Sequence, residues 1–495
     1  MPVTPLSPAR PGWTLFLLAL GQTVFALDLN IVFVALPEIG TDLGFPGQTQ
    51  QLVVSAYVVF AGGFLLLGGR ACDLLGRRRV FIGALVLYAL SSLAGGLARS
   101  PEAIVAARVV QGVGGALLLP SILALVNTLF EEGPRRNRAL AVWGGAGASG
   151  LTLGALLGGV LTEGFGWPAV FFVNVPLAGA IALAAVFVIP PDPARGGRRR
   201  FDLPGALTVT AGATLLVFAL VEGPERGWAD PWILGALAAS LVLLAAFGVI
   251  ETRSADPLMP FRLFRNRSLS AGAAITFLYM ATFGVLPYFL TVLLQSVHGY
   301  SALRTGLAFL APSLAIAAGT QLGERLTTRA GLRPTLLGGF AVGAAGTAVL
   351  AAGFDADAGY LALLPGLVVS GVAQGVVWTA MWIAAAAGTA AHEQGIAGGA
   401  ASTTMNLGNA IGLALFTAVA DAGTDGSGAG ELARATADGG FLVVLLTAAG
   451  MLLGLLLALT LRPGRAAAPD TAWAAAAEDG PETVATGGRA PSAGD

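Results

Sequence analysis

The chain has 495 residues, of which 55% are hydrophobic and only 11% are charged, whereas a soluble domain carries about 25% charged residues. The sequence contains no lysine, which excludes a Walker A phosphate site and Schiff-base chemistry on lysine. A net charge of −1 argues against a nucleic-acid partner. We therefore expect an integral membrane protein, not an enzyme, with no metal site.

Apolar runs long enough to cross a bilayer recur along the whole chain. A transmembrane helix needs about 20 apolar residues, and these runs are too long for barrel strands, which need about ten. The sequence therefore predicts an all-α protein with fourteen transmembrane helices. Their approximate ranges are 13–36, 49–69, 79–98, 102–129, 138–162, 168–189, 204–222, 231–250, 269–295, 303–323, 334–353, 359–386, 396–419 and 440–461.

The arginines lie mainly in alternate loops. With the N-terminus inside, 22 of them fall on the cytoplasmic side and 4 on the opposite side, as expected because basic residues near span ends stay inside. We therefore expect a multi-pass protein of the cell (plasma) membrane with both termini in the cytoplasm. Residues 466–495 have no apolar period, which predicts a disordered cytoplasmic tail.

Only two charged side chains, Asp28 and Arg108, lie in the interior of the apolar runs, away from their ends. Charge in hydrocarbon is costly, so such residues usually face a cavity or a partner and mark a transport path. Both lie roughly 9 to 12 Å from the same membrane surface, so they can meet if their spans face each other across a central cavity. Asp28 then carries protons under the control of Arg108, or the pair is a static buried salt bridge.

The segment after the second span reads GRACDLLGRRR, from Gly69 to Arg79. Gly69 and Gly76 allow a tight turn and close helix approach, and Asp73 can pair with an arginine or cap a helix N-terminus. Together with Arg77 these residues predict a cytoplasmic loop that acts as a conformational latch. The alternative is that the arginines only anchor the topology.

Several segments together resemble the major facilitator superfamily, in particular its fourteen-span drug:proton antiporter branch. GRACDLLGRRR is similar to the superfamily's signature loop, residues 27–37 (LDLNIVFVALP) to the branch's LDxTIVNVALP, and residues 108–114 (RVVQGVG) to its RxxQGxG element. Residues 150–159 and 406–412 are similar to two further elements, with Ala155 in place of a proline and Met405 in place of an arginine. The resemblance covers nearly all of residues 13–461.

This resemblance implies a major facilitator fold with two six-helix halves and two inserted helices. We expect the N-terminal half at 13–189, the inserted helices at 204–250 and the C-terminal half at 269–461. Cytoplasmic linkers are expected at 190–203 and 251–268. Residues 323–333 form an eroded echo of the 69–79 segment, which supports an internal repeat.

Four glycines of the fifth span, Gly150, Gly154, Gly158 and Gly159, are similar to the antiporter motif of the resembled branch. The first three share one helix face and allow another helix to approach backbone to backbone. In the resembled antiporters this kinked helix is associated with export, and Ala155 removes the fixed kink of the proline. Ordinary tight packing is the alternative role.

Amide and aromatic side chains within the spans are candidates for lining a substrate cavity. Aromatic rings, amides and apolar walls suit a bulky amphipathic compound with few charges, while helix packing or interface anchoring is the alternative role. The candidates are Gln22, Asn30, Gln111, Tyr279, Phe283, Tyr288, Gln321, Gln374, Trp378, Trp382, Asn406 and Asn409.

We expect a monomeric, proton-coupled secondary transporter that exports drugs or natural products by alternating access. The proton motive force supplies its drive, and no cofactor is needed, because moving one charge is worth about 2.3 kcal/mol per 100 mV. Three alternatives remain: a nutrient or siderophore facilitator or symporter of the same fold, an integral membrane enzyme, and a non-transporting scaffold or sensor.

Overall fold

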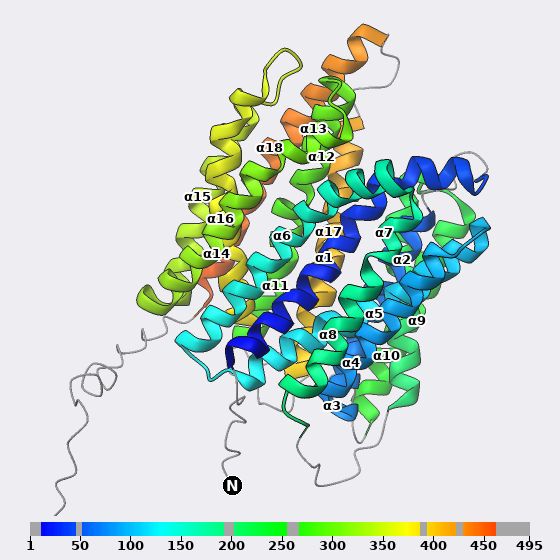
Figure 1. Ribbon diagram of the computed structural model, residues 1–495. Coiled ribbons are helices and arrows are strands. Elements are labelled where there is room, and N and C mark those ends of the chain that lie inside the picture. The colour runs from blue at the N-terminus through cyan, green and yellow to red at the C-terminus, as the bar shows by residue number, and fades with distance from the viewer. Residues whose placement is uncertain are drawn as a thin grey trace, which may run out of the picture.

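The computed structural model describes residues 11–45, 52–192, 202–254, 267–386, 394–421 and 429–461. Every regular element within these residues is a helix, and most of the helices run side by side (Figure 1). The expectation of an all-α fold is therefore confirmed. The tail predicted at 466–495 and most of the two predicted linkers lie outside the described residues.

The N-terminal half is built from helices separated by short breaks, two of which depend on a glycine. Gly76 (φ 108°) separates α3 from α4, and Gly166 (φ 79°) separates α6 from α7; side chains other than glycine rarely adopt such a backbone conformation. α2 and α3 are bent by 50° relative to each other. The helices are α1 (Pro11–Asp42), α2 (Leu52–Gly63), α3 (Leu65–Leu75), α4 (Arg77–Gly96), α5 (Pro101–Leu129), α6 (Pro134–Phe165), α7 (Pro168–Phe172) and α8 (Asn174–Val188).

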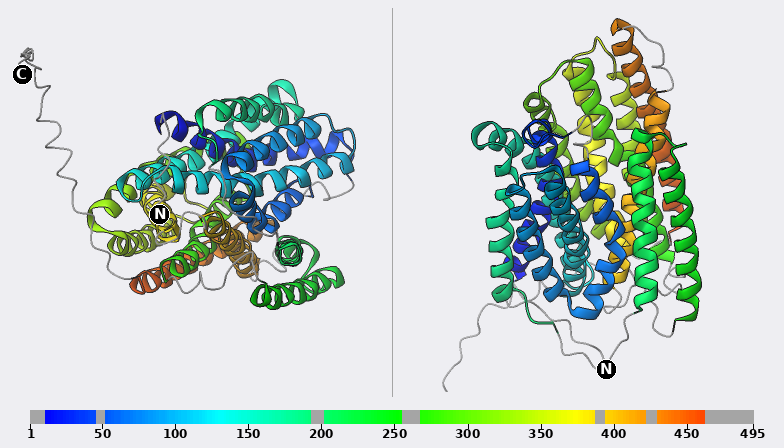
Figure 2. Two further views of the ribbon diagram at one scale, coloured as in Figure 1. Left: turned by 90° about the horizontal axis from the view of Figure 1, so that it is seen from below. Right: turned by 90° about the vertical axis from the view of Figure 1, so that its right-hand side faces the viewer.

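Two inserted helices, α9 (Leu203–Arg226) and α10 (Pro231–Arg253), pack against each other as a hairpin at one edge of the molecule (Figure 2). Each begins after an aspartate whose carboxylate accepts backbone N–H hydrogen bonds, the usual N-cap chemistry. α9 also packs against α2 and α17. The hairpin therefore contacts both halves.

The C-terminal half begins with one interrupted span. In the interrupted span, α-helical segments alternate with a 3-10 turn and a π-helical turn. The interrupted span consists of α11 (Arg267–Thr282), η3 (Phe283–Val285), α12 (Leu286–Val292) and η4 (Leu293–Val297). The remaining helices of this half are α13 (Ala302–Ala308), α14 (Leu310–Ala330), α15 (Leu332–Ala352), α16 (Tyr360–Ala386), α17 (Gln394–Asp421) and α18 (Ala429–Leu459).

Each of the fourteen predicted spans corresponds to one helix or to consecutive helical segments. In the described part of the chain, 12 helices are long and apolar enough to cross a membrane, and the bent pair α2–α3 makes 13. α17, with 28 residues, is not among these membrane-spanning candidates.

One prediction was wrong: residues 69–75 are not a loop but the end of α3, and Gly76 alone breaks the helix before α4. The charged residues and glycines of the 69–79 segment indicated a loop, although its first seven residues are helical.

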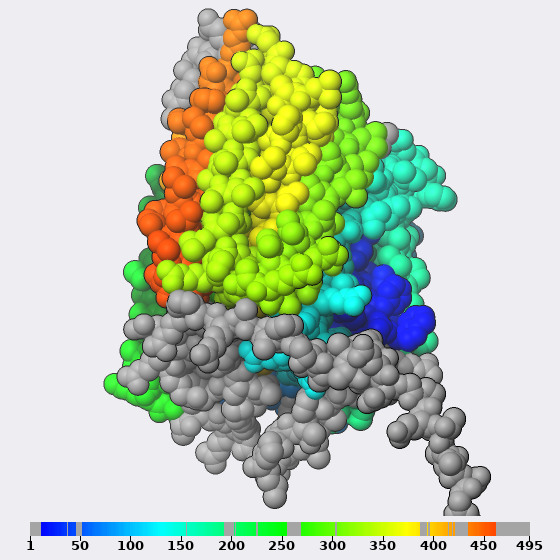
Figure 3. All heavy atoms as spheres, turned by 90° about the vertical axis from the view of Figure 1, so that its left-hand side faces the viewer, coloured from blue at the N-terminus to red at the C-terminus, as the bar shows by residue number. Residues whose placement is uncertain are grey.

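Apolar side chains cover the outer surface as well as the core. Figure 3 shows α14, α15 and α16 side by side on one face. Large exposed hydrophobic side chains on these helices include Leu314, Val342, Val349 and Leu361. Soluble monomers rarely expose contiguous apolar patches beyond a few hundred Å², so this face is suited to lipid.

The two halves lie side by side when the molecule is viewed from below (Figure 2). Across their interface, α6 packs on α14 and α16, and α17 packs on α3 and α5. We call the end where α4 and α6 begin and α14 ends the arginine-rich end, since it carries Arg77, Arg135 and Arg329. At this end Asn137 Nδ2 of α6 donates to Thr328 Oγ1 of α14 at 3.1 Å, so the halves are joined there.

Candidate transport site

Asp28 and Arg108 are in direct contact inside the N-terminal half. Arg108 NH1 lies 2.6 Å from Asp28 Oδ2, and the two side chains are 0% and 1% exposed. Asp28 comes from α1 and Arg108 from α5, which pack against each other. The pair is enclosed by helices of its own half and does not face an open central cavity in this conformation.

A ring of polar groups completes the bonding of the pair. Gln111 Nε2 and Asn174 Nδ2 each donate to Asp28 Oδ1 at 2.9 Å, and Gln111 Nε2 also lies 2.8 Å from Ser92 Oγ. Arg108 donates from Nε to the Val53 carbonyl at 3.0 Å and from NH1 to Gln111 Oε1 at 2.8 Å. A buried ion pair is tolerated only when its remaining hydrogen-bonding capacity is satisfied in this way.

Tyr57 adds an aromatic face to the arginine. The Arg108 guanidinium carbon lies 4.2 Å from the centroid of the Tyr57 ring, a cation–π arrangement, and the Tyr57 hydroxyl is 3.4 Å from that of Tyr88. The arginine is thus held by α2 as well as by α1, while Tyr88 of α4 extends the polar group.

Glycines set the helix spacing that makes these contacts possible. A Cβ at Gly112, one turn after Arg108, would lie 2.6 Å from the Tyr57 carbonyl of α2. On the other side of α1, a Cβ at Gly150, Gly154 or Gly158 of α6 would lie 2.6, 2.3 or 2.9 Å from a backbone carbonyl of α1. Three of the four antiporter-motif glycines therefore pack against the helix that carries Asp28, whereas Gly159 has no neighbour within 4 Å of such a Cβ.

The predicted latch lies where α3 meets α17 of the other half. A Cβ at Gly399 of α17 would lie 3.3 Å from the Gly69 Cα and 3.1 Å from the Leu65 carbonyl, so the two backbones nearly touch. Asp73 is 8% exposed. Gly76 supplies the positive φ that starts α4, and Arg77 is the first residue of that helix.

Asp192, just beyond α8, joins this group. Its carboxylate accepts hydrogen bonds from the Arg78 and Arg79 backbone N–H groups at 3.2 and 3.3 Å. Asp192 thereby caps the N-terminus of α4, where a negative charge is favourable.

Three tryptophans and a tyrosine form an aromatic cluster across the interface of the halves. Trp143 of α6 stacks on Trp378 of α16 with ring centroids 5.7 Å apart, and the edge contact between Trp143 and Trp382 is 5.1 Å. Tyr279 of α11 lies 5.6 Å from Trp378. Gln22 of α1 accepts a hydrogen bond from the Trp143 indole at 2.8 Å.

The other predicted cavity residues are dispersed. Asn30 Nδ2 donates to the Leu151 carbonyl of α6 at 3.0 Å, and Asn406 Nδ2 to the Ser402 carbonyl of its own helix at 2.9 Å. Gln374 and Asn409 are partly buried, on α16 and α17. Gln111 belongs to the Asp28 group and not to the aromatic cluster.

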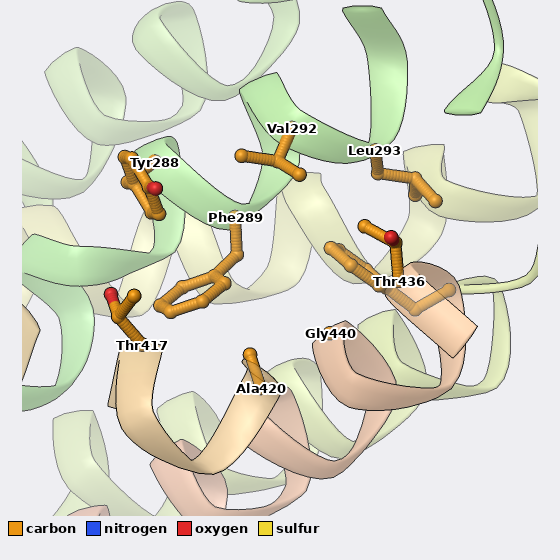
Figure 4. Close-up of a pocket in the computed structure, with 9 residues that line it drawn as sticks. Tyr288, Phe289, Val292, Leu293, Thr417, Ala420, Thr436 and Gly440 are labelled. Carbon is orange, nitrogen blue, oxygen red and sulfur yellow. The ribbon is translucent and has the colours of Figure 1, made fainter. Parts of the chain in front are cut away.

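A cavity of about 50 Å³ lies away from the residues described above. It is lined by residues of α12, η4, α17 and α18 of the C-terminal half together with Phe354. Figure 4 shows the Phe289 ring and the Thr417 and Thr436 hydroxyls around it. Tyr288 is the one predicted cavity residue that lines it.

Sequence reasoning missed Asn174, Ser92, Trp143 and Asp192. Asn174 was visible as a lone amide in an apolar run, and Trp143 as a bulky ring in a glycine-rich stretch. Neither signal separates a site residue from ordinary packing, because amides and aromatic rings are common between membrane helices.

Two halves of six predicted spans each, a buried charge pair and apolar outer faces are the features of a membrane-spanning secondary transporter. The family model described as Major Facilitator Superfamily matches residues 18–413 and 272–481. The chain therefore belongs to the Major Facilitator Superfamily.

Curated relatives agree with this assignment, and a solved structure shares the fold. The chain is 37% identical to the puromycin resistance protein of Streptomyces alboniger, over 90% of both chains. It is 39% identical to the cephamycin export protein CmcT of Amycolatopsis lactamdurans, over 82% of this chain and 84% of that protein. The crystal structure of the human organic anion transporter MFSD10 matches with a TM-score of 0.66 at 20% identity, over 90% of this chain and 99% of that chain; this match shows the fold.

Proposed function

We propose that the protein is a proton-coupled exporter of antibiotic-like or other drug-like compounds, acting as a monomer in the plasma membrane without cofactor or catalytic step. The observation that carries this proposal is the Asp28–Arg108 pair, an ionisable carboxylate enclosed in a membrane-spanning half. The relatives named for puromycin resistance and cephamycin export support the export direction and the substrate class.

The proton step follows from the bonding of the pair. Asp28 Oδ2 accepts the hydrogen bond from Arg108 NH1. A proton that binds this oxygen neutralises the carboxylate and so removes its attraction to the Arg108 guanidinium. Arg108 keeps the Val53 carbonyl, Gln111 and the Tyr57 ring face as partners. Its guanidinium therefore still has hydrogen-bond and cation–π partners when Asp28 is protonated. A rearrangement of α1 against α5 then links protonation to the movement of the halves.

The aromatic cluster is our candidate for the binding surface of the exported compound. It joins α6 of one half to α11 and α16 of the other, so its rings separate when the halves rock. None of the acidic side chains whose burial the structure describes in the C-terminal half is buried: Glu324 is partly exposed, and Asp355, Asp357 and Asp438 are exposed. This environment suits an amphipathic compound with few charges.

The arginine-rich end is our candidate for the cytoplasmic side, by the positive-inside rule. Asn137–Thr328 and the Gly69–Gly399 approach then close the molecule toward the cytoplasm. In this account the 69–77 segment is a latch that opens when the compound enters from the cytoplasm.

Expression in a pump-deficient bacterial host tests the proposal. We expect increased resistance to puromycin or another compound of a screened antibiotic panel, with lower cellular accumulation that an uncoupler restores to the level of the empty vector. Higher accumulation in expressing cells would instead favour the alternative of a nutrient or siderophore importer of the same fold.

A further inference from the structure

A second, smaller cavity lies between the two halves near the arginine-rich end. Its volume is about 10 Å³, which is close to the space that one water molecule needs. Residues of α5 of the N-terminal half and of α16 and α17 of the C-terminal half line it. The lining residues are Leu123, Asn127, Trp382, Ala385, Ala386, Gln394, Ala397 and Gly398.

Two polar atoms among the lining residues are buried without a hydrogen-bond partner in the protein. They are Asn127 Oδ1 and Trp382 Nε1, on side chains that are 6% and 3% exposed. Leaving such groups unpaired costs about 1 to 3 kcal/mol each, so native proteins rarely keep them. One group belongs to each half of the molecule.

The chemistry of the two atoms defines the occupant. An indole N–H only donates, so the occupant must accept a hydrogen bond from Trp382; an amide oxygen only accepts, so the occupant must donate to Asn127. A cation fails the first condition and a simple anion fails the second. Water meets both, and the volume admits nothing larger.

We propose that this cavity is a water-binding site that joins the two halves through Asn127 and Trp382. The water accepts from the Trp382 indole and donates to Asn127, and the remaining hydrogen turns toward Gln394, which also lines the cavity. A bridging water is nearly as good as a direct hydrogen bond, so it stabilises the closed arrangement of α5 against α16 and α17. This role is independent of which compound is exported.

A double-mutant cycle tests the bridge. In a Cys72→Ala background, Ser402→Cys places a thiol at a buried position of α17, one turn from Gly399 on the helix that packs against α3. Its rate of maleimide labelling in inverted vesicles then reports opening. We expect Asn127→Leu and Trp382→Phe each to raise the rate by about three- to tenfold, because each removes a hydrogen bond to the same water.

The decisive result is the combination of the two changes. The double variant should label no faster than the faster single variant, because either change alone removes the bridge. Trp378→Phe is the matched control: its indole N–H is also buried without a partner, but Trp378 does not line the cavity, so its effect should multiply with that of Asn127→Leu. Multiplying effects of Asn127→Leu and Trp382→Phe, or no effect of either, would overturn the proposal.

A direct measurement covers the case in which Asn127→Leu fails to insert. With ¹⁵N-labelled indole nitrogens, Trp382→Phe assigns the Trp382 signal in the full-length protein. We expect a cross-relaxation peak between this N–H and a long-lived water, and its loss in Asn127→Ala. An indole signal without a water peak in the unaltered protein contradicts the bridge.

Discussion

The Asp28 carboxylate accepts hydrogen bonds from side chains of two helices that are far apart in sequence. Arg108 and Gln111 reach it from α5 and Asn174 from α8. Removing one partner of a buried ion pair costs about 3 to 5 kcal/mol because it leaves an uncompensated charge, whereas replacing both partners with well-packed hydrophobic residues of similar volume is often neutral or stabilising. Single and paired substitutions at this site therefore separate the energetics of folding from those of transport.

Asn174→Leu should destabilise the protein and weaken transport. The change deletes the 2.9 Å hydrogen bond to Asp28 Oδ1 and leaves a buried carboxylate with one donor fewer, at a cost of about 1 to 3 kcal/mol. Thermal unfolding in detergent measures the loss. Asn406→Leu is the control, since that amide donates to the Ser402 carbonyl of its own helix. An equal drop in melting temperature for both variants would show that the hydrogen bond to Asp28 contributes no more to stability than a bond within one helix.

Charge in an apolar run was sufficient to find Asp28 and Arg108 from the sequence, and the spacing from Arg108 made Gln111 a neighbour. Asn174 and Ser92 could not be found, because their contact with this group depends on how α4 and α8 rotate in the bundle. Trp143 was missed for the same reason: its stacking partner lies in the other half.

Glycine spacing governs the packing of α1 on α6. A methyl group at Gly154 would lie 2.3 Å from the Leu27 carbonyl, beside Asp28, and neither backbone can yield without moving α1. The same methyl group at Gly159 meets nothing within 4 Å. The sequence predicted the face shared by Gly150, Gly154 and Gly158 from their spacing, but not which helix it contacts.

Gly154→Ala should reduce both folded yield and transport, while Gly159→Ala should be tolerated. In an exposed helix interior glycine is about 1 kcal/mol less favourable than alanine, so the second change should even raise the melting temperature slightly. Fluorescence-detected size exclusion and transport assays compare the two variants. Similar damage from both would contradict the α1–α6 packing described above.

At the scale of the whole molecule, the spans were predictable because hydropathy alone marks them. The arrangement of the halves was not, since it depends on contacts between residues as distant as Asn137 and Thr328. The contact of the inserted hairpin with both halves could not be predicted either. It is made by α9, which packs against α2 and α17, and no local sequence pattern indicates which helices α9 contacts.

A disulfide across the halves should stop transport reversibly. In a Cys72→Ala background, Asn137→Cys with Thr328→Cys places two thiols where the native side chains are 3.1 Å apart. Oxidation should abolish export and reduction should restore it, because alternating access needs these ends to separate. A pair that does not cross the interface of the halves, Gly62→Cys of α2 with Val217→Cys of α9, is the control, because a Cβ at Gly62 would lie 3.8 Å from the Val217 Cβ, a spacing that a disulfide accepts. Full export by the oxidised inter-half pair would contradict the rocking motion.

The central claim is that Asp28 couples proton movement to export, and proteoliposomes test it most directly. The neutral variant Asp28→Asn with Arg108→Gln removes both charges and should fold. With puromycin, or the screened compound that gives the strongest resistance, this variant should exchange compound across the membrane at equal pH. It should not accumulate compound when a pH gradient is imposed, as the unaltered protein does. Gradient-driven accumulation by the neutral variant at the rate of the unaltered protein would contradict the account and leave the pair as a static salt bridge.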